Sequence, residues 1–159
     1  MKKIVLNACG VKSLGGLKLF LESFDFFSKT DSKIFVLYSE IEFYKDLNNQ
    51  FYENPRVKFY KTTNKRYLHP FLNYFLPKQI LEEINNSDAI VHFGNFGFKT
   101  LKKSFVLIQN ILPLVKKGIR NSILKLLINR SMNLSNFILI QLDHLKEDIA
   151  VSYTHLRAH

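Results

Sequence analysis

Short, continuously apolar runs alternate along the chain with longer segments in which apolar residues recur every three or four positions. The apolar runs span residues 2–8, 33–39, 56–61, 88–94, 104–110 and 136–142. An apolar run without polar alternation is typical of a strand that is buried on both faces. The pattern therefore predicts an α/β fold, a Rossmann-like parallel sheet with helices on both faces.

The segments between these runs have helical spacing. In the first of them, Leu17, Phe20, Leu21, Phe24 and Phe27 recur at intervals of three and four residues, which predicts one apolar helix face. Within residues 66–87 the pattern predicts two helical pieces, with a break around Pro77. It predicts further helices at 40–49, 114–134 and 143–149. The alternation predicts one domain over residues 1–150.

The final stretch, VSYTHLRAH (151–159), does not share the compositional bias of the preceding chain. Its back-translation resembles a sequencing-library adapter read through in frame. We therefore expect residues 151–159 to be a non-native tail and residues 1–150 to be the N-terminal part of a longer protein. His155 and His159 are then not candidates for any site.

Composition excludes several classes of protein. The single cysteine, Cys9, excludes a disulfide framework and a cysteine-rich zinc site, so no metal is expected. No apolar run reaches the roughly 18 residues of a membrane-spanning helix. The start of the chain is too short and too polar-flanked for a signal peptide, so the predicted location is cytoplasmic.

Charge is distributed unevenly over the chain. The net charge is +10, and no Asp or Glu occurs from Ala89 to Leu142. That segment carries Lys99, Lys102, Lys103, Lys116, Lys117, Arg120, Lys125 and Arg130. Such a segment forms either a solvated basic face or a contact with an anionic membrane surface or a polyphosphate ligand. No aromatic RNA-binding signature or helix-turn-helix spacing supports nucleic acid as a partner.

The predicted helix at 114–134 is both basic and amphipathic. Its apolar residues at helical spacing are Ile119, Ile123, Leu124, Leu127 and Ile128. If this stripe packs on the sheet, the cations simply face water. If it lies in a membrane interface, Lys116, Lys117 and Arg120 are the candidate membrane contacts, at the inner face of the membrane.

The loop CGVKSLGG (9–16), between the first strand and the first helix, ends in Gly15 and Gly16. In a parallel sheet, ligands bind beyond the carboxyl ends of the strands. Glycines there let a ligand approach the backbone, and the N-terminus of the helix attracts anions. The alternative is a tight turn that needs positive φ. The loop has neither the G-x-G-x-x-G fingerprint nor a P-loop, so no cofactor is expected.

Polar residues end three later strands. IVHFGNFG carries His92 and Asn95, VLIQN carries Gln109 and Asn110, and LIQLD carries Gln141 and Asp143. Parallel strands place these ends on one rim of the sheet, which makes His92, Asn95 and Asn110 candidate ligand-binding residues together with the glycine pair. A lone histidine can also be structural, and an asparagine after a strand can simply form a turn.

These features, in this order and spacing, resemble the N-terminal half of GT-B glycosyltransferases of family 4, the group 1 type. The segments that carry the resemblance are the glycine pair, DAIVHFGNFG, FVLIQNILP and FILIQLDHLKEDI, and it covers residues 1–150. The resemblance implies two Rossmann-like domains that face each other across a cleft. The N-terminal domain largely binds the acceptor. The C-terminal domain holds the nucleotide sugar through paired glutamates and a basic residue.

The reaction implied by the resemblance is retaining transfer of a hexose from a nucleoside diphosphate sugar to a glycan or lipid-linked acceptor in bacterial cell-surface polysaccharide synthesis. Gly15 and Gly16 would lie against the donor diphosphate or the acceptor, with His92 nearby. Asn110 stands where many members have a histidine, and an amide cannot titrate, so no catalytic residue is assigned.

This chain alone is expected to be inactive because the nucleotide-sugar half is absent from it. Two alternatives stay open. One is a non-enzymatic basic Rossmann-like module that binds anionic lipid or another anionic ligand. The other is a different α/β enzyme such as a nucleotide-sugar epimerase, which lacks support because the glycine fingerprint is missing.

Overall fold

The computed structural model describes residues 1–11, 14–39, 47, 54–63, 65–109 and 112–140. Its strands are β1 (Lys2–Asn7), β2 (Ser32–Tyr38), β3 (Val57–Lys61), β4 (Ala89–His92), β5 (Lys103–Ile108) and β6 (Phe137–Ile140). Its helices are α1 (Leu14–Ser28), the 3₁₀ helix η1 (Arg66–Tyr74), α3 (Lys78–Asn85), α4 (Leu112–Val115) and α5 (Ile119–Leu134).

The strands form one sheet in the order β3-β2-β1-β4-β5-β6, and every neighbouring pair is parallel. The chain first adds strands outward from β1 to β3 and then returns to place β4 on the other side of β1. The strand order therefore reverses between β1 and β4. The predicted α/β parallel sheet is confirmed, and its reversal point is where open sheets of this kind bind ligands.

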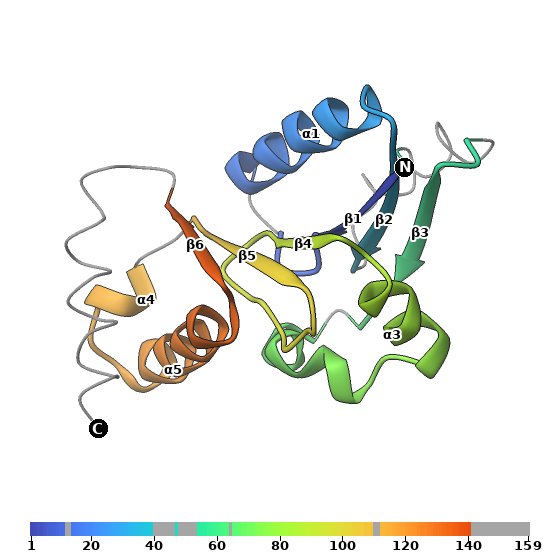
Figure 1. Cartoon of the computed structure of the whole chain (residues 1–159). Coiled ribbons are helices and arrows are strands. Elements are labelled where there is room, and N and C mark those ends of the chain that lie inside the picture. The colour runs from blue at the N-terminus through green and yellow to red at the C-terminus, as the bar shows by residue number, and fades with distance from the viewer. Residues whose placement is uncertain (12–13, 40–46, 48–53, 64, 110–111, 141–159) are drawn as a thin grey trace.

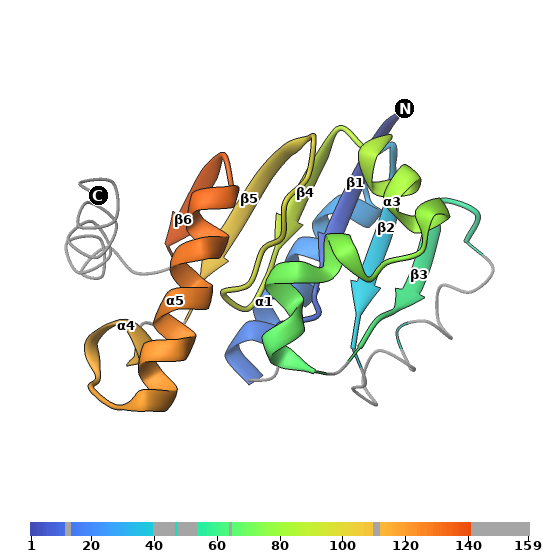
Figure 2. The ribbon, with the colours of Figure 1, turned by 90° about the horizontal axis from the view of Figure 1, so that it is seen from below.

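Helices cover both faces of the sheet, as predicted. Figures 1 and 2 show α1 on one face and η1, α3 and α5 on the other. Alternate residues of β1 serve the two layers: Leu6 belongs to the core that includes Phe20 of α1, whereas Val5 belongs to the core that includes Ile84 of α3. A third core beneath α5 contains Val106, Ile108, Leu127, Ile128 and Met132.

The six predicted strands are confirmed, with bounds within two residues of the apolar runs. The two helical pieces predicted in 66–87 are also confirmed, with Pro77 immediately before α3. The first piece is a 3₁₀ helix that contains Pro70, which has no N–H for a helical hydrogen bond. The helix predicted at 143–149, most of that at 40–49, and the tail at 151–159 lie outside the described residues.

Candidate functional site

The carboxyl ends of β1 and β4 meet at the point where the strand order reverses. β1 ends at Asn7 and β4 at His92, and the two residues are paired in the parallel register. The Phe93 N–H donates to the Asn7 carbonyl at 2.8 Å, which ties the two strand ends together. The site predicted from the sequence is therefore built on this pair of strands.

A buried hydrogen bond joins Asn7 to His92. The Asn7 Nδ2 lies 2.9 Å from His92 Nδ1, and Asn7 Oδ1 accepts the Cys9 N–H at 3.2 Å. Because an amide nitrogen only donates, His92 Nδ1 is the acceptor and the ring proton belongs on Nε2. Both side chains are fully buried, and within the described part of the chain His92 Nε2 has no hydrogen-bond partner. Asn7 was missed by the sequence analysis.

His92 is held as a neutral ring. Burial lowers the pKa of His92 to about 3, so the imidazole is uncharged near neutral pH. Its ring packs edge-on against Phe98 at 5.0 Å between ring centres, and a Cβ at Gly97 would lie 2.9 Å from His92 Cδ2. Its burial and its Nδ1 hydrogen bond fit a structural histidine, although the buried Nε2 has no hydrogen-bond partner among the described residues. Ligand binding by His92 stays a prediction, and it would need the loop at 93–98 to move.

Asn95 connects the loop after β4 to the end of β5. Its Oδ1 accepts the Gln109 N–H at 2.6 Å, and its own N–H donates to the Leu107 carbonyl at 3.2 Å. Asn95 has a φ of 73°, in the left-handed region that asparagine tolerates better than most residues. The side chain is buried, so these hydrogen bonds fix the loop at the reversal point. Contact between Asn95 and a ligand stays a prediction.

The closest backbone approach at this edge joins Gly10, after β1, to Gly94, after β4. A Cβ built on Gly94 would lie 2.3 Å from the Gly10 carbonyl carbon, and one on Gly10 would lie 2.8 Å from the carbonyl oxygens of Phe93 and Gly94. Gly94 also has a φ of 78°. These two glycines therefore allow the loops after β1 and β4 to approach each other closely, a role that the sequence did not predict for them.

The glycine pair lies in a helix rather than in a loop. α1 begins at Leu14, so Gly15 and Gly16 are in its first turn, and the expectation that they end the loop is corrected. Neither residue has positive φ, so a left-handed turn is not the reason for the pair. Gly15 is exposed, with nothing within 4 Å of a Cβ placed on it, whereas Gly16 is buried. The first turn of α1 still follows the carboxyl end of β1.

The other predicted residues lie elsewhere or outside the description. Asn110 is outside the described residues, while the preceding Gln109 follows β5 and donates its N–H to Asn95. Lys116, Lys117 and Arg120 are all exposed around the start of α5. The structure thus brings His92 and Asn95 to the same edge as the first turn of α1.

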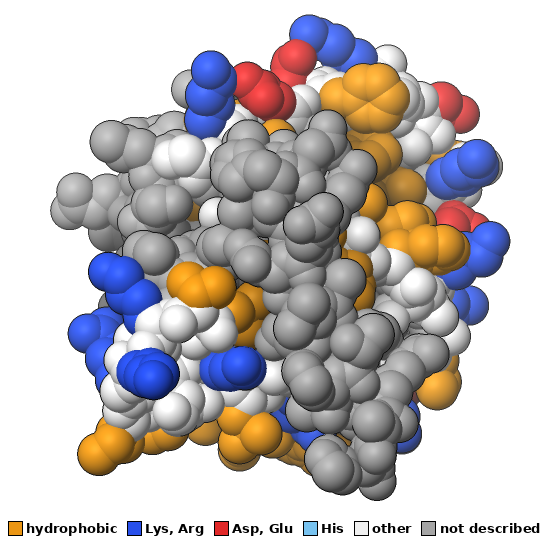
Figure 3. All heavy atoms as spheres, turned by 90° about the vertical axis from the view of Figure 1, so that its left-hand side faces the viewer, with side chains coloured by type: hydrophobic (Ala, Val, Ile, Leu, Met, Phe, Trp, Pro, Cys, Tyr) orange, Lys and Arg blue, Asp and Glu red, His pale blue; other side chains and the backbone are white. Residues whose placement is uncertain are grey.

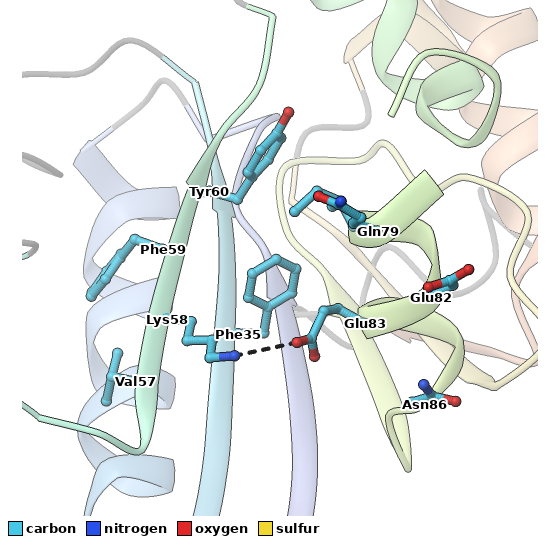
Figure 4. Close-up of a pocket in the computed structure, with 10 residues that line it drawn as sticks. Phe35, Val57, Lys58, Phe59, Tyr60, Gln79, Glu82, Glu83 and Asn86 are labelled. Atoms are coloured by element: carbon cyan, nitrogen blue, oxygen red, sulfur yellow. Dashed lines mark hydrogen bonds and ion pairs between the residues drawn. The ribbon is translucent and has the colours of Figure 1, made fainter. Parts of the chain in front are cut away.

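A groove of about 670 Å³ lies between the edge strand β3 and helix α3, and it contains none of the predicted site residues. Figure 4 shows Phe35 and Tyr60 on its sheet side and Gln79 on its helix side. The Lys58 Nζ lies 3.2 Å from Glu83 Oε1, and Glu83 also pairs with Lys3. Burial, followed by repulsion from Lys58 and Lys33, lowers the pKa of Lys3.

Cys9 is unsuited to nucleophilic chemistry. Its thiol is fully buried, and burial raises its pKa to about 12, so the reactive thiolate is absent near neutral pH. The Sγ lies 2.9 Å from Thr62 Oγ1, and Ser39 Oγ donates to the Cys9 carbonyl at 3.2 Å. Cys9 therefore fastens the loop after β1 to the ends of β2 and β3.

Metal ligands do not gather in the described part of the chain: no group of three or more His, Cys, Asp or Glu side chains there could hold an ion. Comparison of the chain with protein-family models, with curated proteins and with solved structures finds no match.

Proposed function

We propose that this chain is the acceptor-side domain of a GT-B glycosyltransferase. In the full-length protein it would act in retaining transfer of a hexose from a nucleoside diphosphate sugar to a glycan or lipid-linked acceptor of a bacterial cell-surface polysaccharide. The enzyme would act in the cytoplasm, bound peripherally at the inner face of the membrane. The resemblance in the sequence supplies the reaction, and the arrangement of the sheet edge supports it.

The observation that carries the proposal is that two segments meet at the point where the strand order reverses between β1 and β4. The first turn of α1, with Gly15 and Gly16, follows β1, and the loop that holds Asn95 follows β4. The N-terminal end of a 15-residue helix carries a partial positive charge, which favours an anionic group such as a diphosphate. An exposed glycine in that turn leaves room for a ligand to approach the backbone.

The described residues at this edge suit binding better than proton transfer. His92 is neutral near pH 7 and buried, and the Cys9 thiol stays protonated there. In the proposed enzyme, this domain would orient the acceptor and exclude water. Stabilisation of the departing diphosphate would come from the nucleotide-sugar domain. A chain that has this edge but lacks the nucleotide-sugar domain would therefore bind the acceptor without transferring a sugar to it.

The test compares the same substitution at two places on α1 of the full-length protein. We expect Gly15→Val to lower sugar transfer by about 100-fold or more, because a branched side chain at this exposed position would displace the bound ligand from the first turn. Glu22→Val, on an exposed position of the same helix, is expected to leave transfer unchanged. Transfer would be measured with a panel of nucleoside diphosphate sugars and a membrane extract as the acceptor source.

Thermal unfolding of both variants separates loss of activity from loss of folding. Full transfer by a folded Gly15→Val protein would remove the first turn of α1 from the site. If the wild-type protein released no nucleoside diphosphate from any donor but still bound anionic lipid, the non-enzymatic module would replace the enzyme as the function.

A further inference from the structure

Four large apolar side chains stand exposed around the start of α5. They are Val115, Ile119, Ile123 and Leu126, with exposed fractions of 52%, 85%, 48% and 66%. On a helix with 3.6 residues per turn, residues 119, 123 and 126 lie on one side. We call these four residues the α5 patch.

The α5 patch is not the side of the helix that packs on the sheet. Leu124, Leu127 and Ile128 belong to the buried core beneath β5. The five apolar residues predicted as one stripe therefore divide between two sides, because Ile119 and Ile123 face outward. One apolar side secures the helix to the domain. The other apolar side faces away from the domain, where it can contact another apolar environment.

Three cations without acidic partners among the described residues lie next to the α5 patch in the sequence. Lys116, Lys117 and Arg120 are exposed, and none of them forms an ion pair with a described residue. No Asp or Glu occurs in the sequence from Ala89 to Leu142, so this segment supplies no counter-charge of its own. Figure 3 shows hydrophobic side chains along the lower left edge of this side of the molecule, with Lys and Arg directly beside them.

We propose that the α5 patch docks this protein on an anionic membrane surface. The four apolar side chains enter the interface, and the three cations contact the lipid phosphates. No helix in the described residues is long and apolar enough to cross a membrane, so α5 lies along the surface. A second copy of the chain is the poorer occupant, because a symmetric dimer would place like charges opposite each other. This docking surface names the residues for the peripheral membrane location in the proposed function and rests on it for that location alone, not for the sugar transfer.

The chain contains no tryptophan, so a single introduced indole reports on its own surroundings. With vesicles of phosphatidylglycerol and phosphatidylcholine, the emission of Ile119→Trp is expected to shift to the blue and resist quenching by acrylamide. Leu101→Trp, at another exposed position, is expected to show neither change. Vesicles of phosphatidylcholine alone should leave both spectra unchanged. No sugar donor or acceptor is present, so failure here is distinct from failure of the enzyme proposal.

Sedimentation of the full chain with the same vesicles measures how much the three cations contribute to binding. Each cation near an anionic surface contributes about fivefold in affinity at low salt. Lys116→Glu, Lys117→Glu and Arg120→Glu together should therefore weaken binding by about 100-fold or more. The control has the same net charge through Lys18→Glu, Lys29→Glu and Lys78→Glu. These lysines are exposed on α1, just after α1 and on α3, and should matter far less. Ile119→Ser with Leu126→Ser should also weaken binding.

Three results would overturn the proposal. One is wild-type protein that stays in the supernatant with anionic vesicles at low salt. Another is equal binding by the two charge-reversal triples, which would mean that net charge alone drives adhesion. The third is a blue-shifted Ile119→Trp spectrum before vesicles are added, which would mean that another part of the protein already covers the α5 patch.

Discussion

Gly94→Ala is expected to lower the free energy of unfolding by about 3 kcal/mol or more. A left-handed φ costs a residue with a Cβ roughly 1–2 kcal/mol, and Gly94 has a φ of 78°. The added Cβ would also lie 2.3 Å from the Gly10 carbonyl carbon, a backbone atom that cannot rotate away. Overpacking of this kind typically costs about 1–3 kcal/mol more. Urea unfolding followed by circular dichroism gives the measurement.

Gly15→Ala is the matched control for this substitution. Gly15 lies in the first turn of α1 without positive φ, and no atom lies within 4 Å of an added Cβ. Alanine favours a helix over glycine by about 1 kcal/mol at most, so we expect stability to be unchanged or slightly raised. Equal losses in both variants would show that the approach of Gly10 to Gly94 does not hold the two loops together.

Acidification is expected to destabilise the fold through His92. Its pKa is about 3 in the folded chain, against an ordinary value of 6.5. Between these values the unfolded chain binds a proton that the folded chain does not. The contribution is therefore fully present above about pH 6.5 and is lost as the pH falls toward 3. Between pH 7 and pH 5 the loss amounts to about 2 kcal/mol.

His92→Gln isolates this contribution, since glutamine does not titrate yet keeps an acceptor for the Asn7 amide. Unfolding in urea at pH 7 and pH 5 should show a smaller loss on acidification in the variant than in the wild-type protein. Taking the difference between the two proteins removes most of the contribution of other groups. A pH dependence that is the same in both would show that His92 accepts a proton without unfolding.

The strands were predictable from the sequence because burial on both faces leaves an uninterrupted apolar run, and Pro77 marked the start of α3 for the same kind of local reason. The close approach of Gly10 to Gly94 was not predictable from the sequence, because it joins segments that only the pairing of β1 with β4 brings together. A usable signal did exist for Asn7. It is the polar residue that ends β1, as His92 ends β4, and parallel neighbours place such residues side by side.

The two sides of α5 show a different limit. Apolar residues at helical spacing indicate a helix, but the pattern alone assigned Ile119 and Ile128 to one stripe. The structure turns Ile128 into the core and leaves Ile119 exposed, because the sheet contacts only one side of the helix. The first turn of α1 was misplaced for a related reason. Glycines disfavour helix interiors, and the pair hid a helix start that lies at Leu14.

The burial of Cys9 makes its thiol a probe of local opening at one corner of the sheet. Cys9 is the single cysteine of the chain, and its side chain is wholly inaccessible beside Thr62. An alkylating reagent can react with it only while the ends of β1, β2 and β3 separate. The rate of labelling therefore reports how often that corner of the sheet opens. A ligand held at the reversal point would slow the reaction, so occupancy becomes readable from a wild-type thiol without an assay of catalysis.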